Sequence, residues 1–210
     1  MMDALSNKLT MTIKMNVKDV DEEKAEIINY GLTVLFSQII KTIVLLAIAY
    51  YLGILNLVLI SMVTFGFYRC FAGGAHSNTH IGCFVFSSII FLGAVYSSVF
   101  LSSYVNFTGI LFFTIFIINC IIIYYFAPAD VEQKPILSRM FRERQRLYSA
   151  FSMGLIFMIA LTIIKSPVIS TLLIMITLFE SISMLPIIYK IVGCKYGWRS
   201  INNQEIEPLE

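Results

Sequence analysis

Charged residues are scarce in this sequence: Asp, Glu, Lys and Arg make up 13% of the 210 residues, whereas hydrophobic residues make up 58%. A chain with so few polar side chains cannot cover a water-soluble globule of this size, so the composition excludes a soluble globular protein. The net charge of +2 gives no sign of a surface for nucleic acid. We therefore expect an all-α integral membrane protein, because lipid requires each spanning segment to satisfy its own backbone hydrogen bonds.

Cysteine and histidine are also few, with four and two residues respectively. The cysteines contain no CxxC pair, and a cytoplasmic placement keeps thiols reduced, so no disulfide framework is expected. Both histidines and two of the cysteines lie in one stretch, RCFAGGAHSNTHIGCF, residues 69–84. This stretch is therefore the first candidate for a functional site.

Long apolar runs, by contrast, are abundant. Five of them have roughly the 17 to 25 residues that a helix needs to cross a bilayer: residues 32–52, 81–101, 105–126, 148–164 and 167–192. A sixth run, residues 57–71, reaches only about 22 Å at about 1.5 Å per residue, less than a hydrocarbon core of about 30 Å. We expect a polytopic helical protein with about six hydrophobic segments, of which the second is short and either crosses obliquely or is re-entrant.

Basic residues are distributed unevenly along the chain. If the amino terminus is cytoplasmic and all six runs cross, the outer turns hold only Lys165, and the other lysines and arginines outside the spans lie inside. By the positive-inside rule, both chain ends and residues 69–84 then face the cytoplasm. Residues 3–20 place apolar side chains three or four apart between lysines. This pattern predicts an amphipathic helix that lies on the inner leaflet or packs on the protein's own cytoplasmic loops.

No internal repeat or second domain is visible, so residues 1–210 are expected to form a single membrane domain. Within it, we expect residues 1–30 to form an amphipathic region at the cytoplasmic face. Residues 32–192 would form the transmembrane bundle, and residues 193–210 a cytoplasmic tail.

Two groups of charged residues lie outside the stretch 69–84. Lys41 and Glu180 fall inside predicted spans, where a charge is costly unless it is paired or in water, so they are candidates for an intramembrane pair or a polar substrate groove. The run RMFRERQR, residues 139–146, is expected to anchor the topology at anionic headgroups or, alternatively, to hold an acidic peptide tail.

His76 and Cys83 supply the two groups that a thiol protease needs, a sulfur nucleophile and an imidazole that takes its proton. They are seven residues apart, which on a continuous helix means a rise of about 10.5 Å, too far for a hydrogen bond. The helix must therefore break between them. Gly73 and Gly74 loosen the end of the second run, and residues 77–79 (Ser-Asn-Thr) are good N-caps for the next one.

In that arrangement Cys83 lies near the start of a helix, and His76 folds back over it from the preceding loop. Free amides of Gly73 and Gly74 could then face a developing oxyanion. Two other interpretations stay open. Interfacial histidines are common in membrane proteins, and a Gly-Gly pair also serves close helix packing. Alternatively, His76, His80 and Cys83 have a HxxxHxxC spacing that could hold zinc, but the stretch has no acidic residue to act as a base. We expect neither a metal nor another cofactor.

The stretch R-C-F-A-G-G-A-H-S-N-T-H-I-G-C, followed by a hydrophobic helix, resembles the signature of the accessory gene regulator protein B (AgrB) family of bacterial quorum sensing. Two more segments are similar to that family: Y-x-x-A-P-A-x-x-x-x-K-P-I at residues 124–136, and E-S-I-S-M-L-P from Glu180. The resemblance thus covers most of the chain. It implies a multi-pass protein of the bacterial cell membrane whose active site faces the cytoplasm.

Members of that family are membrane-embedded cysteine endopeptidases that process a small propeptide, AgrD, into a cyclic autoinducing peptide. The resemblance implies that Cys83 attacks the bond before the acidic tail of an AgrD-like propeptide, with His76 as general base. The acyl-enzyme thioester would then be closed to a thiolactone or lactone. Arg69 matches the family's arginine and is expected to contact the substrate's carboxylates or the local backbone. Membrane lipids are further expected partners, and a homodimer is compatible with small-residue helix faces.

A different class of function, a small multi-pass peptide transporter or exporter without protease activity, is also compatible with six spans and intramembrane charges. The two functions differ in one observable. Only the peptidase cleaves a propeptide in a reaction that depends on Cys83.

Overall fold

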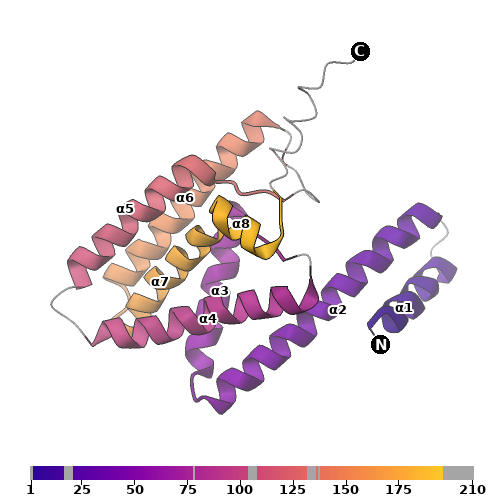
Figure 1. The fold of residues 1–210 in the computed structure, drawn as a ribbon, viewed down its shortest axis with the longest axis horizontal. Helices are drawn as coiled ribbons and strands as arrows, with labels where there is room; N and C mark the ends of the chain where they lie inside the picture. Colours follow the sequence, from indigo (N-terminus) through magenta and orange to yellow (C-terminus); the bar gives the residue numbers. More distant parts are fainter. Residues whose placement is uncertain are drawn as a thin grey trace. The chain divides into compact units, whose positions relative to one another are not determined.

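The computed structural model describes residues 2–16, 21–77, 79–103, 108–131, 136 and 138–195. These residues form eight α-helices (Figure 1): α1 (Met2–Asn16), α2 (Glu22–Tyr51), α3 (Leu55–Ala72), α4 (His80–Ser102), α5 (Thr108–Phe126), α6 (Arg139–Thr162), α7 (Pro167–Ser183) and α8 (Pro186–Val192). The all-α class predicted from the composition is confirmed.

The chain divides into two compact units, Met1–Gly53 and Ile54–Glu210. The first unit contains α1 and α2, and the second contains α3 to α8. The residues of the stretch 69–84 all belong to the second unit. The single domain expected over residues 1–210 stays a prediction.

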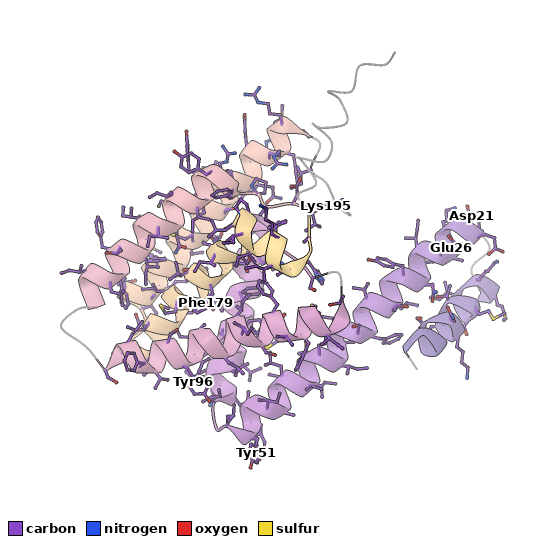
Figure 2. All side chains as sticks on the ribbon, viewed as in Figure 1. Asp21, Glu26, Tyr51, Tyr96, Phe179 and Lys195 are labelled. Atoms are coloured by element: carbon purple, nitrogen blue, oxygen red, sulfur yellow. The ribbon has the colours of Figure 1, made fainter. Side chains whose placement is uncertain are left out.

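In the first unit, α2 begins where the sequence has an acidic cluster. Asp21 is the N-cap, and its side chain accepts a hydrogen bond from the backbone N–H of Lys24 at 2.8 Å. Helix α1 lies beside the first half of α2 (Figure 1), where the Thr33 hydroxyl donates to that of Ser6 at 2.7 Å. Figure 2 labels Asp21 and Tyr51 near the two ends of α2. Of the two expectations for the N-terminal helix, packing on the protein itself is observed, although its partner is a helix and not a loop.

In the second unit, α7 is the central helix. It contacts α3, α4, α5 and α6, and every residue from Ser170 to Thr177 is buried. The ring of Phe179 packs over Gly93 of α4, where a Cβ would lie 3.3 Å from the ring, and Figure 2 shows this side chain inside the unit. Helix α7 therefore connects the elements that carry the candidate site.

Four helices, α2, α3, α4 and α5, are long and apolar enough to cross a membrane. The pair α7 and α8 is a fifth candidate, either a broken span or a re-entrant loop, because the two helices pass the same test together but are bent by 75°. The short second run predicted from the sequence is α3. Its 18 residues reach about 27 Å at about 1.5 Å per residue, which makes it a candidate span.

Two of the six predicted segments differ in the structure. The run 148–164 is the second half of α6, which begins at Arg139 and carries its basic residues in the same helix. The run 167–192 is interrupted after Ser183, and Pro186 starts α8 because proline lacks the N–H that would continue a helix. The apolar runs therefore predicted where the helices lie but not the residues at which they begin and end.

Candidate active site

The segment that follows α3 is a tight turn built around two glycines. Gly73 and Gly74 have φ values of 73° and 145°, which favour glycine because a side chain is strained there. Space is lacking as well: a Cβ on Gly73 would overlap the carbonyl oxygen of Ala129, and one on Gly74 would lie 2.5 Å from the Oγ atom of Ser183. The turn is thus packed against two segments that are distant in the sequence.

Backbone hydrogen bonds fix this turn. The N–H of Gly73 donates to the carbonyl of Arg69 in α3 at 3.0 Å, and the N–H of Gly74 donates to the carbonyl of Ala129 at 2.9 Å. The N–H of Ala75 donates to the carbonyl of Ser183 at 3.2 Å. The expectation of free oxyanion donors at Gly73 and Gly74 is therefore wrong for this conformation, because both amides already have carbonyl partners. The two glycines allow close packing, which is the alternative that a Gly-Gly pair also indicates.

Arg69 connects the turn to α7. Its Nη1 atom lies 3.0 Å from both carboxylate oxygens of Glu180, whose side chain is fully buried. Its Nη2 atom donates to the carbonyls of Gly74 and Ala75 at 3.1 and 2.6 Å. A planar guanidinium can make these contacts at once because its donors form a rigid fork. Of the two contacts expected for Arg69, the one with the local backbone is observed.

Lys41 and Glu180 are candidates for an intramembrane pair or a polar substrate groove, and in the structure the ionic partner of Glu180 is Arg69. Glu180 takes Arg69 as its partner, and Ser183 donates a further hydrogen bond to the carboxylate at 3.3 Å. The physical reason is the packing of α3 on α7, which brings the last turns of both helices together in the low-dielectric interior. Lys41 lies on α2, in the other unit.

The segment 127–130 (Ala-Pro-Ala-Asp) follows α5 and is buried. The Asp130 carboxylate accepts a hydrogen bond from Nη1 of Arg142 on α6 at 2.9 Å, and a second one from the N–H of Ile136 at 3.0 Å. Nη2 of Arg142 donates to the carbonyl of Pro128 at 3.2 Å. Arg142 therefore binds this segment through both the carboxylate of Asp130 and the backbone carbonyl of Pro128.

Two further side chains hold the same segment. Nε of Arg146 donates to the carbonyl of Ala127 at 3.0 Å, and the hydroxyl of Tyr189 on α8 donates to the carbonyl of Asp130 at 3.0 Å. Two arginines of the run 139–146, Arg142 and Arg146, thus bind the protein itself, whereas headgroups or an acidic peptide tail were expected as partners of this run. One feature of the sequence indicates this role, because the basic run directly follows a proline-bounded segment, but the sequence does not identify the partners.

Cys83 lies in the first turn of α4 and is 8% exposed. Thr79 is the N-cap of this helix: its side chain accepts a hydrogen bond from the N–H of Gly82 at 3.1 Å, and its carbonyl accepts one from the N–H of Cys83 at 2.9 Å. The predicted break between His76 and Cys83 is confirmed, because α3 ends at Ala72 and α4 begins at His80.

The end of the loop between α3 and α4 contacts the first turn of α4. A Cβ on Gly82 would overlap the Oγ atom of Ser77 and would lie 2.6 Å from Oγ1 of Thr79. Ser77 follows His76 directly, and Gly82 directly precedes Cys83. The contact between residues 77 and 82 therefore brings the loop that carries the imidazole to the helical turn that carries the thiol.

His76 is exposed, and its Nδ1 atom lies 3.0 Å from the carbonyl oxygen of Ser77. A carbonyl can only accept, so Nδ1 is the donor of this hydrogen bond. The zinc alternative involves the side chain of His80, which lies outside the described part of the structure.

Comparison with known sequences identifies the family. A model described as Accessory gene regulator B matches residues 6–184. The chain belongs to this family. A putative AgrB-like protein of Clostridium acetobutylicum is 32% identical over 188 residues, which cover 89% of this chain and 87% of that protein. Accessory gene regulator protein B of Staphylococcus aureus strain Newman is 33% identical over 162 residues, which cover 77% of this chain and 82% of that protein. No solved structure matches the chain.

The matched region of the Accessory gene regulator B family contains the Gly-Gly turn, the loop with His76, the first turn of α4 and the segment 127–130. It ends at Met184, directly after α7 and the residues that bind the turn. The family match thus covers every element that positions the candidate site except α8.

Proposed function

We propose that this protein is a membrane-embedded cysteine endopeptidase that removes the C-terminal tail of an AgrD-like propeptide and promotes cyclisation to an autoinducing peptide for quorum sensing. Membership of the Accessory gene regulator B family supports the biological role. The observation that best supports the chemistry is the contact between Ser77, which follows His76, and Gly82, which precedes Cys83.

In the first step, the sulfur of Cys83 attacks the carbonyl carbon of the peptide bond between the future signal and its tail. His76 takes the thiol proton as the S–C bond forms. The C–N bond then breaks, and His76 returns the proton to the amine of the leaving tail. The products of this step are a free tail and a thioester between the signal segment and Cys83.

In the second step, a thiol or hydroxyl within the signal segment attacks the thioester carbonyl. The S–C bond to Cys83 breaks, the thiol of Cys83 is regenerated, and a thiolactone or lactone ring closes. Exchange of a thioester for a thiolactone is nearly isoenergetic, so this step needs no nucleotide. Water competes for the same carbonyl and must be excluded, which a site at the membrane boundary with a buried Cys83 would serve.

The donors for the oxyanion would come from α4 and not from the Gly-Gly turn. The N–H groups of Gly73 and Gly74 are engaged. The first amides of a helix have no partner within that helix, and its positive end stabilises negative charge on sulfur and oxygen. We therefore assign the oxyanion site to the first-turn amides before Gly82, on the cytoplasmic side of the membrane.

The test is a cleavage assay with the full chain in lipid vesicles. A synthetic AgrD-like propeptide is added, and the masses of its products are followed. We expect release of an acidic tail fragment that is lost in Cys83→Ser and kept in Cys70→Ser. Transfer of intact peptide across the bilayer, without cleavage by any variant, would contradict the proposal and support the transporter.

A further inference from the structure

Two arginines of this protein make the same arrangement of contacts. Arg69 pairs with Glu180 and donates to two carbonyls of the Gly-Gly turn. Arg142 pairs with Asp130 and donates to the carbonyl of Pro128. In both pairs the carboxylate is almost fully buried, with exposed fractions of 0% for Glu180 and 1% for Asp130. Each arginine is thus oriented by a buried carboxylate and binds the backbone of a loop.

The two loops are themselves joined. The N–H of Gly74 donates to the carbonyl of Ala129 at 2.9 Å, and the N–H of Ala129 donates to the carbonyl of Ala72 at 2.8 Å. The carbonyl of Ala129 also occupies the space that a Cβ on Gly73 would take, so the two strands of backbone cannot slide past each other without a collision. The position of the Gly-Gly turn therefore depends on the position of the segment 127–130.

We propose that Arg142, oriented by Asp130, is a positioning residue for His76. The inference rests on the proposed function, in which His76 takes the proton of Cys83. Arg142 fixes the segment 127–130, that segment fixes the Gly-Gly turn, and His76 follows the turn by two residues. In this sequence of contacts, Arg142 acts on His76 through the backbone of the two loops.

Burial distinguishes Arg142 from Arg139 and Arg144 on the same helix. The side chain of Arg142 is 16% exposed, whereas Arg144 is exposed to solvent and Arg139 makes only a surface pair with Glu143. Exposed ion pairs contribute little, but removal of one partner of a buried pair leaves the other charge uncompensated. Arg144 therefore provides a matched control on the same helix and with the same charge.

The experiment measures the reactivity of Cys83 and needs no substrate. The full chain in vesicles of phosphatidylcholine and phosphatidylglycerol is treated with iodoacetamide at neutral pH, and alkylation is followed by mass spectrometry for each cysteine. Exposed Cys70 normalises the rates, and Cys120, inside the candidate span α5, reports unfolding if it becomes reactive. A positioned general base contributes about 10²- to 10⁴-fold, so its displacement has a large effect.

We expect Arg142→Gln to lower the alkylation rate of Cys83 by about tenfold or more, in the direction of His76→Ala, while Arg144→Gln keeps the rate of the unmodified protein. Arg142→Lys should recover part of the rate, because it keeps the charge but not the fork of donors. If Cys120 becomes reactive in Arg142→Gln, that variant is unfolded, and Asp130→Asn takes its place. This milder variant can still accept the N–H of Ile136 and should lower the alkylation rate of Cys83 in the same way.

Two results would overturn the inference in different ways. If His76→Ala lowers the rate of Cys83 and both Arg142→Gln and Asp130→Asn leave it unchanged, Arg142 does not position the imidazole, and the proposed function stands. If His76→Ala itself leaves the rate unchanged, the pairing of His76 with Cys83 is wrong, and the positioning role is lost with it.

Discussion

Nη1 of Arg69 lies 3.0 Å from both carboxylate oxygens of Glu180, a residue 111 positions later in the chain. This contact joins the last turn of α3 to the last turn of α7, and the same guanidinium binds the backbone of Gly74 and Ala75. A side chain of the central helix thereby determines where the loop with His76 begins.

Removal of the buried carboxylate should destabilise the second unit. Glu180→Gln leaves the charge of Arg69 without its partner, and loss of one member of a buried pair costs about 3 to 5 kcal/mol. The free energy of unfolding in mixed detergent micelles measures this effect. Glu143→Gln is the control, because its pair with Arg139 is exposed and should contribute less than about 1 kcal/mol. Equal effects of the two variants would contradict the role of Glu180.

A side chain at Gly73 should not be tolerated. Gly73→Ala places a Cβ on the carbonyl of Ala129 at a φ of 73°, and strain of this kind costs about 1 to 3 kcal/mol before the collision is counted. Gly66→Ala is the control on α3, where a Cβ meets open space and should stabilise the helix by about 0.5 to 1 kcal/mol. The midpoint temperature of thermal unfolding should therefore fall for Gly73→Ala and rise for Gly66→Ala. A shift in the same direction for both variants would contradict the packing of the turn.

The N-cap of α4 should matter for both stability and activity. Thr79→Ala removes the hydrogen bond to the N–H of Gly82 and is expected to cost about 1 kcal/mol. Because Cys83 lies in the turn that this cap orders, the rate of propeptide cleavage should also fall. Thr79→Ser keeps the hydroxyl and should preserve both quantities. A loss of activity in Thr79→Ser as large as in Thr79→Ala would show that the cap is not the cause.

The contact between the loop and α4 can be tested by a clash and its relief. Gly82→Ala places a Cβ against the hydroxyls of both Ser77 and Thr79, of which that of Ser77 is the nearer, and should displace the loop with His76, so that the cleavage rate falls. The double variant Ser77→Ala with Gly82→Ala removes that hydroxyl and should recover part of the rate. The comparison needs Ser77→Ala alone as a reference. If the double variant is no faster than Gly82→Ala, the two residues do not control the approach of His76 to Cys83.

The features that could be predicted from the sequence are local ones. Helix geometry forbids a contact between His76 and Cys83 along one helix, and the glycines and the Ser-Asn-Thr segment predict the break that the structure has. Thr79 is the N-cap because its side-chain oxygen can accept a hydrogen bond from the backbone N–H three residues later, that of Gly82. The start of α2 after Asp21 follows from the same rule.

The features that could not be predicted depend on packing between distant segments. The partner of Glu180 is Arg69 because α3 packs on α7, and no pattern within either run indicates that contact. The amides of Gly73 and Gly74 are engaged because residues 129 and 183 lie beside them. The basic run 139–146 has the composition of a headgroup anchor, and only the position of the segment 127–130 shows that Arg142 points inward.

The central claim is that Cys83 carries the signal segment as a thioester. Its most direct test is the intact mass of the full chain, quenched in acid at early times after addition of an AgrD-like propeptide. We expect an adduct with the mass of the signal segment on Cys83 that hydroxylamine removes, present in His80→Ala and absent in Cys83→Ser and His76→Ala. Release of the tail by Cys83→Ser at the rate of the unmodified protein, with no adduct in either, would contradict the account.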